Sequence, residues 1–157
     1  MINAYDLILK TKGNPGKNGI NFGSGSEVSV NSSSSSSKSI IIIDDEPDIC
    51  EMFKIALQGN GYGVITFTNP IIALEHLLNN PNKCELVISD YCMPYLNGCE
   101  LGNKIKELNE NIKVILMSAY DSIEDNNKHN FELLRKPVTI QKLIDIVNAS
   151  LNNNAKS

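Results

Sequence analysis

The chain has 157 residues, carries a formal net charge of −4 and is 41% hydrophobic. This composition fits one globular domain with a hydrophobic core, and it excludes two large domains. No apolar run approaches the length that crosses a membrane, and the N-terminus lacks the basic start of a secretion signal. We therefore expect a cytoplasmic protein with no membrane partner.

The cysteines are Cys50, Cys84, Cys92 and Cys99, and no two of them form a C-x-x-C pair. Only two histidines accompany them, so the spacing supports neither a zinc site nor a disulfide framework. We expect free thiols, most of them buried.

The charge is unevenly distributed along the chain. Residues 1–38 contain four lysines and two acidic residues, which leaves a net charge of −6 on residues 39–157. Arg135 is the only arginine in the sequence. Because nucleic-acid binding depends on clustered basic side chains, we expect no direct contact of this acidic part with nucleic acid.

The first 38 residues also differ in composition from the rest. Glycines recur between Gly13 and Gly25, and the serine run Ser32–Ser37 follows them, a composition that predicts a disordered, flexible tail. We expect this tail over 1–38, one domain over 39–152 and a short C-terminal tail over 153–157.

From residue 39 onward, short apolar runs alternate with segments of helical periodicity. The apolar runs predict strands at 40–43, 62–67, 85–89, 113–117 and 131–134. The periodic segments predict helices at 49–57, 69–78, 101–108 and 140–151, and the polar segment 121–130 is expected to form a short or frayed fifth helix. This alternation is typical of an α/β protein with a doubly wound, five-stranded parallel sheet.

Polar side chains follow the predicted strands at the edge where such a sheet binds its ligand. Asp44 and Asp45 follow the first strand, Asp90 the third, Ser118 the fourth and Lys136 the fifth. Three carboxylates in one crevice repel one another and need a cation, and an all-oxygen site that also admits a phosphate suits Mg²⁺. The lysine and the hydroxyl would then receive an anion.

Each of these residues alone has a simpler interpretation. An acidic residue after a strand, such as Asp44 or Asp48, often only caps the next helix. A single lysine such as Lys136 is most often a solvated surface residue. Their joint placement at one edge of the sheet favours a functional site.

Four segments, in this order, resemble the receiver domain of two-component response regulators. They are IIIIDDEPD at 40–48, SDYCMPYLNG at 89–98, LMSAY at 116–120 and LLRKP at 133–137. The resemblance covers residues 39 to about 152. It implies the flavodoxin-like receiver fold, which agrees with the predicted order of strands and helices.

The resemblance also implies a role for each acidic residue. Asp90 would be the phosphoacceptor, whose carboxylate attacks the phosphorus of a phosphohistidine. Asp45 and Asp90 would bind Mg²⁺ directly, and Asp44 would hold the ion through water. The backbone carbonyl of Cys92 would be the remaining ligand from the protein.

On the anion side, Ser118 and Lys136 would contact the phosphoryl oxygens, and the Lys136–Pro137 peptide bond would be cis. The sequence departs from the family at Leu133, three residues before the lysine, where an aromatic residue usually serves as a switch. Only 17 residues separate Ser118 from Lys136. We therefore expect the switch in the backbone of 118–130.

The expected function is phosphorelay signal transduction by a stand-alone receiver, because few residues follow the last predicted helix. A histidine kinase or phosphotransfer protein would donate the phosphoryl group, and an unidentified output protein would bind the altered surface. The domain would hydrolyse its aspartyl phosphate without being a dedicated enzyme, and a weak homodimer is possible.

Two other functions stay open. One is a receiver-like interaction module without phosphate turnover. The other is a small Mg²⁺-dependent phosphatase, which usually has a second acid two residues after its nucleophile, where this chain has Cys92.

Overall fold

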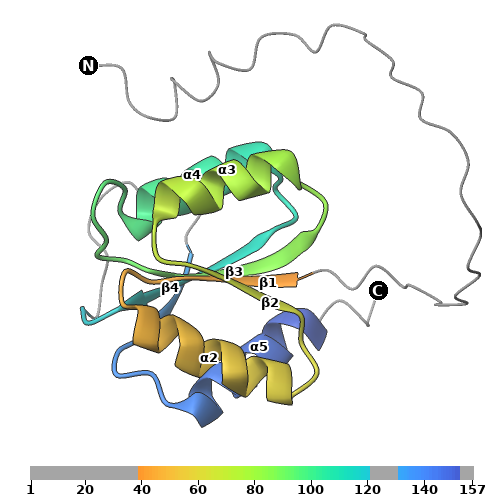
Figure 1. The fold of residues 1–157 in the computed structure, drawn as a ribbon, viewed down its shortest axis with the longest axis vertical. Helices are drawn as coiled ribbons and strands as arrows, with labels where there is room; N and C mark the ends of the chain where they lie inside the picture. The colour runs from red at the N-terminus through yellow and green to blue at the C-terminus, as the bar shows by residue number, and fades with distance from the viewer. Residues whose placement is uncertain (1–38, 121–130, 153–157) are drawn as a thin grey trace, which may run out of the picture. The chain divides into compact units, whose positions relative to one another are not determined.

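In a computed structural model of the chain, residues 39–120 and 131–152 are described, and they contain a five-stranded parallel sheet (Figure 1). The strands are β1 (Ser39–Ile43), β2 (Val64–Phe67), β3 (Cys84–Asp90), β4 (Lys113–Ser118) and β5 (Glu132–Arg135). Their order in the sheet is β2-β1-β3-β4-β5, and each neighbouring pair is parallel. The predicted doubly wound sheet is confirmed.

The helices of the described residues are α2 (Pro47–Gly59), α3 (Pro70–Asn79), α4 (Gly98–Leu108) and α5 (Ile140–Asn152). In Figure 1, α3 and α4 lie on one face of the sheet and α2 and α5 on the other. None of these helices is long and apolar enough to cross a membrane. The fifth predicted helix, at 121–130, and the predicted tails over 1–38 and 153–157 lie outside the described residues.

Local sequence signals explain where two helices begin. Asn69 caps α3, because its side-chain oxygen accepts a hydrogen bond from the Ile71 N–H at 2.9 Å, and Pro70 occupies the first helical position. The start of α4 is a capping box, in which Asn97 accepts from the Glu100 N–H and the Glu100 carboxylate accepts from the Asn97 N–H. The helix predicted at 69–78 begins at the first of these caps, whereas the capping box was not predicted.

The strand β1 is buried on both faces, as expected inside a parallel sheet. Each of its isoleucines, Ile40–Ile43, is at most 1% exposed. Ile40 and Ile42 belong to the core cluster that contains Phe53 of α2 and Leu143 of α5. Burial of consecutive positions leaves no solvent-facing side, so the carboxyl end of β1 is held firmly against both layers of helices.

The strand β2 begins two residues later than predicted, at Val64 opposite Ile40 of β1. Tyr62 belongs instead to the turn after α2, because its N–H donates a hydrogen bond to the Leu57 carbonyl at 3.1 Å. Gly61 precedes it with a φ of 88°, the left-handed conformation that favours glycine after a helix.

Candidate functional site

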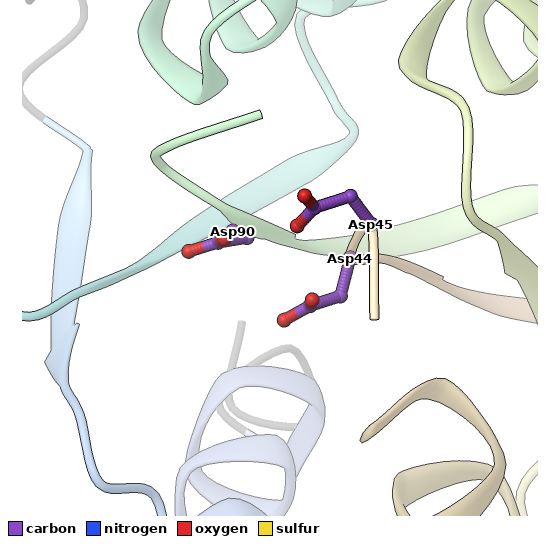
Figure 2. Close-up of side chains that lie close together, drawn as sticks. All are labelled: Asp44, Asp45 and Asp90. Carbon is purple, nitrogen blue, oxygen red and sulfur yellow. The ribbon is translucent and has the colours of Figure 1, made fainter. Parts of the chain in front are cut away.

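Three carboxyl groups meet at the carboxyl ends of β1 and β3 (Figure 2). Asp44 and Asp45 follow β1, and Asp90 is the last residue of β3. Because β1 and β3 are parallel neighbours, these ends lie at the same edge of the sheet. One carboxylate oxygen of each residue lies within 4.8 Å of the other two. The structure thus brings together the acidic residues that the sequence singled out.

Two of the three carboxyl groups are buried. Asp44 is 0% exposed and Asp90 is 6% exposed, whereas Asp45 is exposed. Burial has the largest effect on the pKa of Asp44 and raises it above the ordinary value. The Glu46 N–H and the charge of Lys136 lower this pKa, and the charge of Asp90 raises it again, so a further cation would favour the ionised form.

Lys136 reaches the cluster from the end of β5. Its Nζ lies 2.9 Å from Oδ1 of Asp90 and 3.4 Å from Oδ2 of Asp44, and its side chain is 27% exposed. Burial lowers the pKa of Lys136, but the hydrogen bond to Asp90 and the charges of Asp44 and Asp90 together raise it above the ordinary value. The ammonium group is therefore a charged partner of two carboxylates and not a solvated surface group. The Lys136–Pro137 peptide bond is cis, as the family resemblance implies.

Ser118 is the last residue of β4 and is 2% exposed. In the pairing of β3 with β4, Asp90 lies opposite Met117, so Ser118 is one residue further toward the edge that carries the carboxyl groups. Its Oγ accepts a hydrogen bond from the Tyr120 N–H at 3.0 Å. This contact uses an oxygen lone pair, so the hydroxyl hydrogen can be donated to another acceptor.

The loop from β3 to α4 carries Cys92, which is exposed. The loop turns at Tyr95, whose φ of 73° lies in the left-handed region. It returns to the strand where the Gly98 N–H donates a hydrogen bond to the Tyr91 carbonyl at 2.9 Å. The backbone of Cys92 thus belongs to a folded-back loop that leaves the cluster directly after Asp90.

Sequence reasoning missed three contacts that hold the buried acidic residues. The Glu46 N–H donates to Oδ1 of Asp44 at 2.9 Å, the Cys50 thiol donates to the Asp44 carbonyl at 3.4 Å, and the Ser89 hydroxyl donates to the Asp90 carbonyl at 2.9 Å. The contact between Glu46 and Asp44 closes a local turn, in which an aspartate side chain accepts a hydrogen bond from the N–H two residues later. The aspartate at position 44 is the sequence signal for this turn. Asp44 therefore folds back on its own backbone and does not cap α2, whose N-cap is Glu46.

Gly98 brings the first turn of α4 against the backbone of Asp90. A Cβ atom at position 98 would lie 2.6 Å from the Asp90 carbonyl oxygen and 2.9 Å from Cα of Tyr91. Both atoms belong to the backbone and cannot move without moving the end of β3. Glycine at this position therefore helps to set where Asp90 lies.

The donor set fits a magnesium ion. Mg²⁺ prefers oxygen ligands at about 2.0 to 2.1 Å in an octahedron, which places adjacent ligand oxygens about 3 Å apart and opposite ones about 4 Å apart. The oxygens of Asp44, Asp45 and Asp90, within 4.8 Å of one another, need small rotations or one bridging water to meet this spacing. A divalent cation would also offset the repulsion among the three carboxylates.

A groove of about 540 Å³ opens beside Lys136. Glu46 and Lys136 line one part of it, and the rest is lined by apolar side chains: Ile49, Met52, Phe53, Met117, Ala119, Pro137 and Val138. Met52, on α2, is 41% exposed. An open apolar surface thus adjoins the charged cluster.

Comparison with known proteins agrees with this geometry. A family model described as the response regulator receiver domain matches residues 40–148. The transcriptional regulatory protein GlrR of Escherichia coli is 29% identical over 120 residues, which cover 74% of this chain and 27% of GlrR. The chain spans about a fifth to a half of the length of the curated relatives that it matches.

Solved structures resemble the described fold over nearly their whole length. A response regulator receiver domain protein from Clostridium thermocellum is 32% identical, with a TM-score of 0.68, and the match covers 75% of this chain and 97% of that one. The response regulator TrrA of Thermotoga maritima, solved in complex with Mg²⁺ and beryllium fluoride, is also 32% identical. Its TM-score is 0.64, and the match covers 73% of this chain and 99% of TrrA.

Proposed function

Because this chain belongs to the response regulator receiver domain family, we propose that it takes part in phosphorelay signalling by accepting a phosphoryl group on Asp90. The observation that carries the proposal is the position of Asp90, which lies in a cluster with Asp44 and Asp45 and 2.9 Å from Nζ of Lys136. A histidine kinase or a phosphotransfer protein would be the donor. The receiver domain itself would extend over 39–152.

The transfer needs one new bond and breaks one old bond. An oxygen of the Asp90 carboxylate bonds to the phosphorus of a phosphohistidine as the N–P bond breaks, and the electron pair of that bond remains on the imidazole, which takes up a proton. Both reactants carry negative charge, so alignment and charge neutralisation decide the rate. The buried position of Asp90 beside Lys136 supplies both.

The acidic cluster would hold Mg²⁺ as the cofactor. Asp45 and Asp90 would bind the ion directly, Asp44 through water, and Cys92 through its backbone carbonyl. When bound, Mg²⁺ offsets the charge of the carboxylates and of the phosphoryl oxygens. The spacing of the carboxylate oxygens supports this assignment, as does the similarity to TrrA, which was solved with Mg²⁺.

Ser118 and Lys136 would bind the transferred group. The Ser118 hydroxyl would donate a hydrogen bond to one phosphoryl oxygen, and the Lys136 ammonium would move from the carboxylates to pair with another. The acyl phosphate on Asp90 would then be lost by hydrolysis in the same crevice. The chain would thus turn over its own phosphoryl group without acting as a dedicated enzyme.

The apolar groove beside Lys136 supports a protein as the phosphodonor. The groove, which includes the exposed Met52, would receive the apolar face of a helix of the donor protein, while the donor histidine faces Asp90. Phosphorylation would change how an output protein, still unidentified, or a second copy in a weak homodimer binds. With these partners, the protein would act in the cytoplasm and would not contact nucleic acid or membrane directly.

Mass measurement tests the proposal directly. The protein is incubated with Mg²⁺ and acetyl phosphate, and its intact mass is measured. We expect a gain of one phosphoryl group in the wild type and no gain in Asp90→Asn. Asp145→Asn is the matched control, because Asp145 is an exposed carboxyl group on α5, and this variant should gain mass as the wild type does.

Two results would contradict the proposal. A wild-type protein that gains no mass with Mg²⁺ and acetyl phosphate favours a receiver-like interaction module without phosphate turnover. A gain that persists in Asp90→Asn shows that another residue is the acceptor.

A further inference from the structure

The ring of Phe131, just before β5, packs directly on the backbone of α4. A Cβ atom at Gly102 would lie 2.8 Å from both Cε2 and Cζ of this ring, and Phe131 is 6% exposed. Glycine weakens the middle of a helix, because it gains freedom when the helix unfolds. The close contact with Phe131 gives this helix position a structural reason to lack a side chain.

A second glycine lies one turn earlier on the same face of α4. Gly98 and Gly102 are four residues apart, so both face the sheet, and side chains of β4 would lie 3.2 and 3.3 Å from Cβ atoms at the two positions. Gly98 contacts the backbone of Asp90, and Gly102 contacts Phe131. The helix α4 therefore crosses over β4 and joins the end of β3 to the start of β5.

The position of Lys136 depends on how β5 is held. This strand has four residues and lies at the edge of the described sheet, where β4 is its neighbour. Its carboxyl end is tied to β4, because the Lys136 N–H donates a hydrogen bond to the Ser118 carbonyl at 2.8 Å. Its amino end is held by the packing of Phe131 on Gly102.

We propose that Gly102 and Phe131 are positioning residues, which set the orientation of β5 so that Lys136 reaches the group bound at Asp90. The inference rests on the proposed function. Asp90 lies on β3, beyond β4, so a small rotation of the short strand β5 changes the distance from Nζ of Lys136 to Asp90, which is 2.9 Å in the structure. Phe131, directly before this strand and two positions before Leu133, thus acts through packing.

Beryllofluoride, a mimic of the phosphoryl group, tests the inference when its binding and that of Mg²⁺ are titrated separately by calorimetry. Gly102→Ala should bind beryllofluoride roughly tenfold more weakly than the wild type, because a misplaced Lys136 loses a charge-assisted hydrogen bond. The affinity for Mg²⁺ alone should not fall, because the proposed Mg²⁺ ligands lie at the ends of β1 and β3 and in the loops that follow them, away from β5. General damage to the fold would weaken both.

Rescue and control variants sharpen the test. Leucine lacks the Cε2 and Cζ atoms of phenylalanine, so the double variant Gly102→Ala with Phe131→Leu should recover most of the lost affinity for beryllofluoride. Gly59→Ala is the matched control, because a Cβ atom there meets nothing within 4 Å, and it should bind as the wild type does. Lys136→Met shows the affinity that remains without the lysine.

The outcomes separate the two proposals. If the wild type with Mg²⁺ does not bind beryllofluoride, the proposed function fails. If the wild type binds but Gly102→Ala binds equally well, or the double variant binds no better than Gly102→Ala, the positioning inference is overturned. If Gly102→Ala does not fold by circular dichroism, the double variant is compared with Phe131→Leu alone, and weaker binding by the double variant overturns the inference.

Discussion

Removal of the charge on Lys136 tests the electrostatics of the site without any phosphoryl transfer. Lys136→Met leaves Asp90 and Asp44, which are 6% and 0% exposed, without the ammonium group that lies 2.9 and 3.4 Å from them. Loss of one partner from a buried ion pair costs about 3–5 kcal/mol, and loss of an exposed pair costs about 0–1 kcal/mol. Because the lysine side chain is 27% exposed, we expect the free energy of unfolding at neutral pH, without Mg²⁺, to fall by about 2–3 kcal/mol.

Urea unfolding followed by circular dichroism measures this loss. A slope of about 1–2 kcal/mol per molar urea converts it to a midpoint lower by about 1–3 M. The pKa of Lys136 is raised in the folded state, so its contribution is fully present below the unfolded value of 10.5 and is lost as the pH rises through the higher folded value. Below about pH 3 most carboxyl groups are protonated, and the difference from the wild type should shrink.

Lys142→Met is the control, because Lys142 is an exposed lysine on α5, and it should change the midpoint little. Added Mg²⁺ should recover part of the stability lost in Lys136→Met, since a cation in the acidic cluster compensates for the missing charge. An unchanged midpoint for Lys136→Met at neutral pH, or a loss of the same size near pH 3, would refute the electrostatic reasoning.

Three further results are expected. Asp45→Ala should abolish labelling by acetyl phosphate although Asp90 is intact, because the two anions then approach each other without the cation. Measurement of the intact mass with and without EDTA checks this, and undiminished labelling would count against the metal site. Gly98→Ala should lower the free energy of unfolding in urea by about 1–2 kcal/mol, because its Cβ would lie 2.6 Å from a backbone oxygen, whereas Gly59→Ala should not lower it. Iodoacetamide should label the exposed Cys92 in the native protein. Burial raises the pKa of Cys50 to about 11 and that of Cys84 to about 12, so these two thiols should react at least about 100-fold more slowly. Equal labelling in peptide mass spectra would show that the buried thiols are accessible.

The parts of the fold that were predictable from the sequence are those with a local signal. The four isoleucines of β1 mark a strand buried on both faces, and Asn69 with Pro70 marks the start of α3. The predicted start of β2 lies two residues too early, because tyrosine is common in strands but Tyr62 closes the turn after α2. Apolar composition alone does not distinguish these two uses.

In the candidate site, too, some features were predictable from the sequence and others were not. Asp44, Asp45 and Asp90 were predicted to meet because each follows a parallel strand, and the parallel pairing of β1 with β3 brings them together. The contacts that hold them were not predicted. The thiol of Cys50 and the missing side chain of Gly98 act on residues that other segments bring close, and no local pattern reports such an approach.

The groups of the site belong to strands that differ in how many neighbours hold them. In the described sheet β1 and β3 each lie between two strands, whereas β5 is at the edge. Free energies of local opening, as amide hydrogen exchange reports them, are lowest where few backbone hydrogen bonds and few packed side chains must break. Transient opening of β5 would therefore withdraw Lys136 and leave the three carboxyl groups in place. The three carboxyl groups would then form a cation site that stays in place. The ammonium group of Lys136 would leave this site and return to it at the rate at which β5 opens and closes.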